Sequence, residues 1–219
     1  GFLRLSSKKD KFALQDLLLT QLLVAYDLAS AFKYLHRYKV VYRDIRPDNI
    51  GFDVRGDVKV FDFGLAKPLH HSLRSKKVKN MYNLTAKTGS MPYMAPEVAR
   101  GRPYNHLCDV FSYSILVWEI LALKIAFDDD NDGGQTIPTP QQYFTRITVQ
   151  GQRPPIPRGG RWPVRTSSIL KECWDANPEK RPEFDRIVSM IQLDLKDITN
   201  DDTVTNRSTH MSMRSQHSL

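Results

Sequence analysis

The spacing of apolar residues predicts a long helix near the start of the chain. Apolar side chains recur there at steps of three and four residues, at Leu18, Leu22, Ala25, Ala29 and Phe32. This spacing gathers them on one face of a helix. We expect the helix to run from Phe12 to about Arg37.

Two short apolar runs follow the helix and predict a β-hairpin. The runs are Ile50–Phe52 and Val58–Phe61, and the pair Arg55-Gly56 lies between them. Glycine accepts the backbone angles of a tight turn, so the two runs are expected to pair as antiparallel strands.

The second half of the chain is predicted to be helical. Residues 107–123 are apolar nearly all round, which is typical of a buried helix. Asp109, near its start, is expected to cap it. A final helical block is expected from Ile169 to Leu193. From about Lys196 the chain is polar, and residues 196–219 are expected to form a disordered tail.

Composition narrows the function classes. The 219 residues carry a net charge of +8, but no basic helix with interleaved aromatic residues accompanies it, so we expect no nucleic-acid partner. The pattern also predicts no membrane span. The two cysteines, Cys108 and Cys173, match no metal-ligand spacing. A reduced, intracellular (cytoplasmic) protein is therefore expected.

Polar side chains that could take part in catalysis lie close to the predicted hairpin in the sequence. The run Y-R-D-I-R-P-D-N before it contains Asp44, Arg46 and Asn49, and Asp62 follows the second strand. A hairpin would bring these groups side by side. Two oxygens from different residues can hold Mg²⁺, another carboxylate can accept a hydroxyl proton, and a cation can steady a migrating phosphate.

These motifs resemble the catalytic loop and the metal-binding D-F-G of eukaryotic protein kinases. The resemblance implies that Asp44 is the catalytic base, that Arg46 contacts the transferred phosphate, and that Asn49 takes part in catalysis. It also implies that Asn49 and Asp62 bind ATP through Mg²⁺. It covers residues 12–195, which correspond to the large lobe of the kinase fold. The expected fold is therefore mainly α, with a short β-hairpin that carries the catalytic and metal-binding loops.

The same resemblance implies structural and regulatory roles for a further set of residues: Arg43, Thr85, Thr88, Ser90, Glu97, Asp109 and Arg181. A phosphate on Thr85 or Thr88 would meet Arg43. Asp109 would hold the backbone of the catalytic loop.

The resemblance also implies two contacts between segments that are distant in the sequence. The hydroxyl of Ser90 would bond Asp44 and its basic neighbour, a feature that favours Ser/Thr over Tyr as substrate. Arg181 would pair with Glu97, the glutamate of the M-A-P-E sequence that resembles the family's A-P-E. The stretch around Arg181 resembles the tyrosine-kinase-like group.

The sequence departs from the family pattern in two respects. No G-x-G-x-x-G and no strand lysine precede Asp44, so residues 1–11 are interpreted as the end of the connection between lobes, and the small β-rich lobe that completes the nucleotide pocket is expected to be absent from this chain. Arg46 stands where lysine is usual. We expect a protein serine/threonine kinase that uses ATP, Mg²⁺ and a protein substrate. The alternative is a pseudokinase that acts as a protein-binding scaffold.

Overall fold

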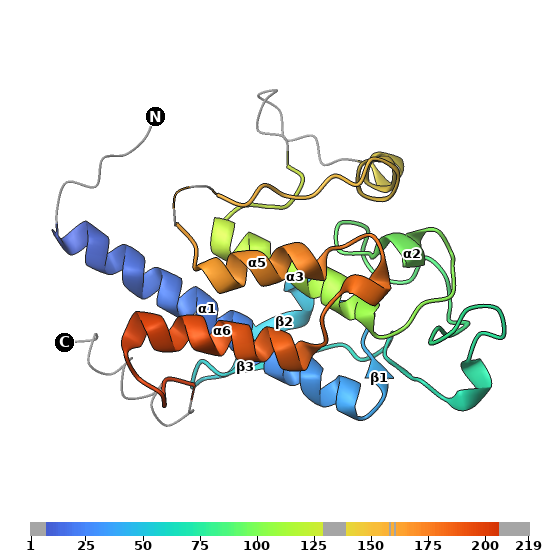
Figure 1. Cartoon of the computed structure of the whole chain (residues 1–219), viewed down its shortest axis with the longest axis horizontal. Helices are drawn as coiled ribbons and strands as arrows, with labels where there is room; N and C mark the ends of the chain where they lie inside the picture. Colours follow the sequence, from blue (N-terminus) through green and yellow to red (C-terminus); the bar gives the residue numbers. More distant parts are fainter. Residues whose placement is uncertain (1–7, 129–138, 158, 160, 206–219) are drawn as a thin grey trace.

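The computed structural model describes residues 8–128, 139–157, 159 and 161–205. Four helices form its core: α1 (Lys8–Arg37), α3 (Leu107–Ala122), α5 (Val164–Cys173) and α6 (Phe184–Thr199). α1 packs against α3 and α6, and α5 packs against the same two helices. Figure 1 shows α1 and α6 side by side and running in opposite directions. The mainly α fold expected from the sequence is confirmed.

α1 buries the apolar face that its sequence predicts. Leu22, Ala25, Ala29 and Phe32 are all inaccessible to solvent, and Leu18 packs against the same core. The helix begins at Lys8, four residues before the predicted start, because its polar first turn carries no apolar signal.

α1 is also more apolar than we expected from the sequence. Phe12–Arg37 contains an 18-residue window of mean hydropathy 1.3, so by length and composition this helix could cross a membrane. Buried residues make up 33% of that window, and a core helix of a soluble protein passes the same test. The finding is weak evidence for a span, and the expectation of no membrane span stays a prediction.

α3 confirms the predicted buried helix but corrects the predicted cap. His106 occupies the N-cap position and makes no capping bond with its side chain. The backbone amide of Leu107 instead donates to Asn105 Oδ1 at 3.0 Å. Asp109 lies within the first turn, and its carboxylate bonds to another segment, described below.

The final helical block is two helices, not one. α5 ends at Cys173, and the short helix η5 (Pro178–Lys180) precedes α6. Proline lacks the amide that a continuous helix needs, so Pro178 and Pro182 interrupt it.

The tail is ordered further than predicted. α6 continues to Thr199, and Val204 is only 2% exposed because it packs into the core. The expectation of disorder is wrong for residues 196–205. Residues 206–219 lie outside the described part of the chain.

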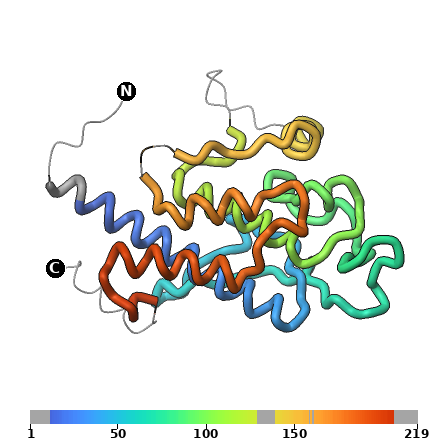
Figure 2. The backbone as a smooth tube through the Cα atoms, in the orientation of Figure 1, coloured from blue at the N-terminus to red at the C-terminus, as the bar shows by residue number. Residues whose placement is uncertain are grey.

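Two small antiparallel sheets support the loops between α1 and α3. β2 (Ile50–Phe52) pairs with β3 (Val58–Val60) in the register Ile50↔Val60, as the predicted hairpin requires. β1 (Val40–Val41) pairs with β4 (Lys67–Pro68). The remaining elements are short: η1 (Pro47–Asn49), η2 (His71–Leu73), α2 (Pro96–Ala99), α4 (Pro140–Tyr143) and the π-helix η4 (Phe144–Val149). Figure 2 shows that residues 70–85 form an irregular loop at the right-hand end of the molecule.

Candidate active site

Asp109 anchors the loop that carries the candidate catalytic residues. Its carboxylate is fully buried and accepts hydrogen bonds from the backbone amides of Tyr42 and Arg43, each at 2.8 Å. The Nε2 atom of His36, at the end of α1, lies 2.9 Å from the same carboxylate. The two amide bonds fix the start of the catalytic loop against α3, as the resemblance implied, and the contact with His36 joins α1 to the same carboxylate.

Asp44 is held by two side chains from different segments. Asn49, in the short helix η1 (Pro47–Asn49), donates from Nδ2 to the Asp44 carboxylate at 2.8 Å and to its backbone carbonyl at 2.9 Å. The hydroxyl of Ser90 donates to the other carboxylate oxygen at 3.1 Å. The carboxylate of Asp44 is therefore oriented from both sides, while Asp44 itself stays partly exposed.

Arg46 shares its guanidinium between two partners. Its Nη1 donates to Ser90 Oγ at 2.8 Å, and its Nε donates to Asp48 Oδ2 at 2.8 Å. Nη2 contacts the same oxygen of Asp48. These hydrogen bonds hold the pKa of the exposed Asp48 carboxyl below its usual range. Asp48 was not predicted as a site residue, although it lies only two positions after Arg46.

Asp62 follows β3 and presents an exposed carboxylate. One of its oxygens accepts a hydrogen bond from the amide of Gly64 at 2.9 Å. Asp62 has a φ of 49° and Arg43 a φ of 71°, in the left-handed region that side chains other than glycine rarely occupy. Such strain persists where surrounding contacts over-determine the backbone, and it gathers at functional sites.

Tyr42 connects the two carboxylate-bearing loops. Its ring packs against Phe32 and, edge to face, against Phe63 of the D-F-G triplet, with ring centroids 5.5 and 5.4 Å apart. Its hydroxyl donates to the carbonyl of Phe61. Burial raises the pKa of Tyr42, and the negative charges of Asp44 and Asp62 raise it further. The bond to Phe61 and the contact with Phe63 hold the two residues on either side of Asp62 against the catalytic loop.

Gly89 lets the loop before Ser90 approach the catalytic loop. Its φ is +98°, and a Cβ at this position would lie 2.4 Å from the carbonyl oxygen of Arg43. No side chain fits at that distance from backbone. Glycine is therefore what allows Ser90 to reach Asp44.

Arg43 links the catalytic loop to the predicted phosphorylation region. Its Nε donates to the carbonyl of Leu65 at 2.7 Å and its Nη1 to the hydroxyl of Tyr104 at 3.3 Å. The Tyr104 hydroxyl in turn donates to the carbonyl of Thr85 at 2.8 Å. Thr88 lines a small cavity together with Arg43 and Tyr104. The structure thus brings Thr85 and Thr88 close to Arg43, and Tyr104 is a linking residue that the motifs did not indicate.

Glu97 and Arg181 form the predicted ion pair. Nη1 and Nη2 of Arg181 lie 2.6 and 2.7 Å from the two carboxylate oxygens of Glu97. The Arg181 side chain is fully buried, and it also donates to the carbonyls of Leu107 and Asp175. The pair ties α2, at the end of the loop segment, to the region before α6.

The donor set fits a hard divalent cation. The Nδ2 atom of Asn49 is directed at Asp44, so its Oδ1 is the atom that remains for a metal. Asp62 adds an exposed carboxylate, and oxygen ligands of this kind suit Mg²⁺.

Comparisons with known proteins agree with this geometry. The family model described as "Protein kinase domain" matches residues 8–191. Serine/threonine-protein kinase STY17 of Arabidopsis thaliana is 32% identical over 198 residues, which are 90% of this chain and 31% of that protein. Serine/threonine-protein kinase STY46 of the same plant is 33% identical over 175 residues, 80% of this chain and 27% of that protein.

A third relative has a broader name. Serine/threonine/tyrosine-protein kinase HT1 of Arabidopsis thaliana is 31% identical over 186 residues, 85% of this chain and 42% of that protein. The chain spans less than half the length of each of these relatives. Their names confirm the resemblance that the sequence motifs indicated.

Proposed function

Because the chain belongs to the protein kinase domain family, we propose that the protein containing it transfers the γ-phosphate of ATP to serine or threonine hydroxyls of a protein substrate. The observation that supports this most directly is the placement of Asp44. Its carboxylate is oriented by Asn49 and Ser90 and remains partly exposed, and Tyr42 ties the loop that carries the exposed Asp62 to the same segment.

In the proposed reaction Asp44 accepts the proton of the substrate hydroxyl. The freed oxygen forms a bond to the γ-phosphorus, the bond to the oxygen that bridges to the β-phosphate breaks, and ADP leaves. A base must lie within hydrogen-bond reach of the hydroxyl, and the two bonds to Asp44 hold it in one orientation.

Asn49 and Asp62 would hold Mg²⁺, which neutralises charge on the nucleotide phosphates when it is bound. Arg46 would contact the transferred phosphate through the face of its guanidinium that Asp48 and Ser90 leave accessible. The Arg46 side chain is 37% exposed, so a substrate group can reach it. A positive charge there stabilises charge that develops in the transition state.

We further propose that residues outside this sequence cradle the nucleotide phosphates. The 219 residues contain no G-x-G-x-x-G, and the elements described before Asp44 are α1 and β1. In the family these phosphates are covered by a glycine-rich loop on a small β-rich lobe. That lobe and this chain would form the nucleotide pocket together.

The experiment is a radiolabelled phosphate-transfer assay on the full-length protein with serine, threonine and tyrosine peptides. We expect transfer to Ser and Thr, and we expect Asp62→Asn to abolish it while the unfolding temperature is retained. The matched control is Asp57→Asn, because Asp57 is also an acidic residue of the hairpin region but forms its ion pair with Arg55. Equal, substantial transfer by wild type and Asp62→Asn would refute the assignment.

A protein-binding scaffold is the second candidate. The observation that favours it is the pairing of Arg46 with Asp48. The Asp48 carboxylate neutralises part of the positive charge that a transferred phosphate would contact. A scaffold predicts no transfer in the wild type to any of the three peptides, so the same assay separates the two functions.

A further inference from the structure

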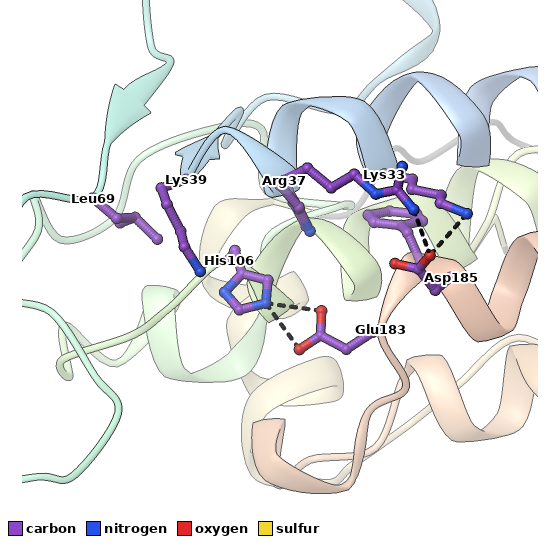
Figure 3. A pocket seen from close by; sticks show the side chains of 9 residues that line it. Lys33, Arg37, Lys39, Leu69, His106, Glu183 and Asp185 are labelled. Carbon is purple, nitrogen blue, oxygen red and sulfur yellow. Dashed lines mark hydrogen bonds and ion pairs between the residues drawn. The ribbon is translucent and has the colours of Figure 1, made fainter.

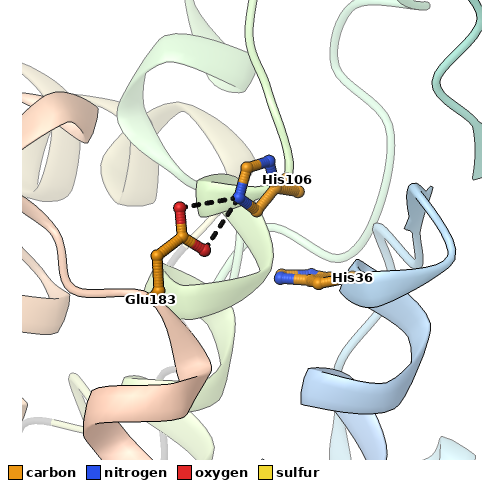
Figure 4. A group of neighbouring side chains, drawn as sticks. All are labelled: His36, His106 and Glu183. Carbon is orange, nitrogen blue, oxygen red and sulfur yellow. Dashed lines mark hydrogen bonds and ion pairs between the residues drawn. The ribbon is translucent and has the colours of Figure 1, made fainter.

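Three potential metal ligands meet on the side of the molecule where α1, α3 and α6 adjoin. His36 lies in the last turn of α1, His106 at the N-cap of α3 and Glu183 at the N-cap of α6. Each offers one ligand atom, and the three atoms lie within 4.8 Å of one another. Figure 4 shows the His36 ring directed from α1 toward the His106–Glu183 pair.

His36 has a hydrogen-bonding atom that the protein leaves without a partner. Its side chain is only 6% exposed. An ionised carboxylate only accepts, so Nε2 donates in the bond to Asp109, and Nδ1 is the ring nitrogen that remains for another partner. Nδ1 is buried and has no hydrogen-bond partner among the described residues. A buried orphan of this kind requires an explanation, and a carboxylate that orients a histidine is the usual setting of a metal-bound imidazole.

His106 and Glu183 are already at nearly the separation of two ligands of one ion. His106 Nε2 lies 3.0 and 2.9 Å from the two oxygens of Glu183. Zinc bonds of about 2.0–2.1 Å in a tetrahedral arrangement place neighbouring ligand atoms about 3.3 Å apart. The ion would take the place of the proton that the two side chains now share, and binding would release that proton. Glu183 is 57% exposed, so it can move to accommodate the ion and to bring the set closer to His36.

The surrounding charges are compatible with a cation. The adjoining cavity has three basic side chains, from Lys33, Arg37 and Lys39. Figure 3 shows Lys33 and Arg37 turned toward Asp185, which lies 2.8 and 3.3 Å from them. Lys39 extends toward His106 in the same view, and it is exposed, so solvent and salt screen its charge.

We propose that His36, His106 and Glu183 bind a divalent transition-metal ion, with Zn²⁺ as the ion that fits best. Two imidazoles and one carboxylate are borderline ligands that suit Zn²⁺ better than Mg²⁺ or Ca²⁺, and water would complete the fourth position. The ion would join the ends of three core helices. His36 shares Asp109 with the anchor of the catalytic loop, but none of the three ligands is a candidate catalytic residue, and the proposal does not rest on the proposed kinase function.

The experiment measures Zn²⁺ binding to the purified 219-residue chain by competition with a chromogenic chelator. The starting protein carries His70→Ala and His71→Ala, which remove the two described histidines that lie outside the proposed site. We expect one Zn²⁺ per chain in this background. Adding His106→Ala or Glu183→Gln should weaken binding by more than about 100-fold, because even outer-shell changes cost about 10–100-fold.

Neither test variant removes a contact to Asp109, and Glu183 makes no capping bond with its side chain, so both should fold. Unfolding temperatures without metal check this. A third variant, Lys39→Gln, is the matched control: it removes an exposed charge that solvent and salt screen and no proposed ligand, so it should leave the Zn²⁺ affinity nearly unchanged. The proposal is overturned if the background protein binds no Zn²⁺, or if His106→Ala and Glu183→Gln leave its affinity unchanged.

Discussion

Arg46 is the single residue whose contacts bear most on the proposed chemistry. Its guanidinium is planar and presents fixed donors, so it can bridge Asp48 and Ser90 at the same time. A lysine ammonium has no such fork. The arginine therefore brings a local partner, Asp48, into a site where the family's lysine would act as a compact charge.

Substitution of Arg46 separates its contact with phosphate from its contact with Asp48. If Arg46 stabilises the transferred phosphate, Arg46→Ala should lower kcat by about 10²–10³-fold, by analogy with the loss of one oxyanion donor. Arg46→Lys should keep or raise the rate. Steady-state kinetics of the full-length protein, with KM for ATP, measures both. The control is Asp48→Asn, which frees the guanidinium and retains its charge; unchanged activity in Arg46→Ala would remove the proposed role.

Gly89 allows a test of close backbone approach. Gly89→Ala and Gly151→Ala both place a side chain at a positive φ, and this strain alone costs about 1–3 kcal/mol. At Gly151 nothing lies within 4 Å of the new Cβ, whereas at Gly89 the carbonyl of Arg43 lies at 2.4 Å. We expect Gly89→Ala to lose more free energy of unfolding than Gly151→Ala, measured by denaturant titration. Equal losses would mean that the approach to Arg43 imposes no constraint.

Most candidate site residues could be predicted at this scale because they lie in short contiguous motifs. Asp44, Arg46 and Asn49 fall within six positions, and a strand–turn–strand fixes where Asp62 returns. Tyr104 belongs to no such motif, and it reaches Arg43 only because the chain folds back from residue 85 to residue 104. Sequence reasoning had no signal for it.

At the scale of elements, the Glu97–Arg181 pair shows how segments far apart in sequence are joined. The two residues are 84 positions apart, and both charges are buried. Phe111 of α3 lies against the guanidinium, with the Arg181 Cζ atom 5.2 Å from the ring centroid. The loop segment that begins at Asp62 therefore ends on a rigid support.

Breaking this pair should be much more costly than breaking an exposed one. Arg181→Ala leaves the Glu97 carboxylate buried without its cation, and we expect a loss of about 3–5 kcal/mol in the free energy of unfolding. The matched control is Arg186→Ala, since Arg186 is 55% exposed and pairs with Glu172. That change should cost less than about 1 kcal/mol. Chemical denaturation of both variants measures the difference, and similar losses would contradict a structural role for the buried pair.

The turn of the β2–β3 hairpin predicts a pH dependence. Burial of Asp53 would raise its pKa, but hydrogen bonds from the amides of Asp57 and Arg55, with the ammonium of Lys59 at 3.1 Å, lower it to about 2. The unfolded chain has the ordinary value of 3.8. A lowered folded-state pKa means that the stabilisation is present above 3.8 and is lost as the pH falls toward 2.

Asp53→Asn tests this dependence. The wild type should be more stable than the variant near neutral pH, and the difference should shrink between about pH 4 and pH 2. Denaturant titrations across this range give the difference directly. A difference that stays constant with pH would show that the charge of Asp53 does not stabilise the turn.

Which elements could be predicted depended on their length and periodicity. α1 and α3 have long apolar patterns and were found, whereas the polar first turn of α1 has none. In α6 the apolar spacing continues to Leu195 and Ile198, and the prediction ended the block too early. The break between α5 and α6 was marked in the sequence by Pro178 and Pro182, and the prediction of one block overlooked it. The two-residue strands β1 and β4 are too short for any periodic signal.

At the scale of the whole molecule, the sequence predicted the fold but not which helix ends lie next to one another. His36 and His106 are on different helices, and Glu183 follows His106 by 77 positions. No local pattern connects these three residues. Only the packing of α1 and α6 side by side with α3 brings them together (Figure 1).

The proposed division of the nucleotide pocket leads to a prediction about the chain as a whole. Asn49 and Asp62 can hold Mg²⁺, but no residue described before Asp44 forms the glycine-rich cover that the family places over the phosphates. We therefore expect the isolated 219 residues to bind Mg-ATP weakly and to show almost no phosphate transfer. Isothermal titration calorimetry measures the first property and the radiolabel assay the second. The full-length protein, assayed under the same conditions, is the control and should bind more tightly and transfer phosphate. Submicromolar binding by the isolated chain would show that these residues form a complete pocket and that no second lobe is needed.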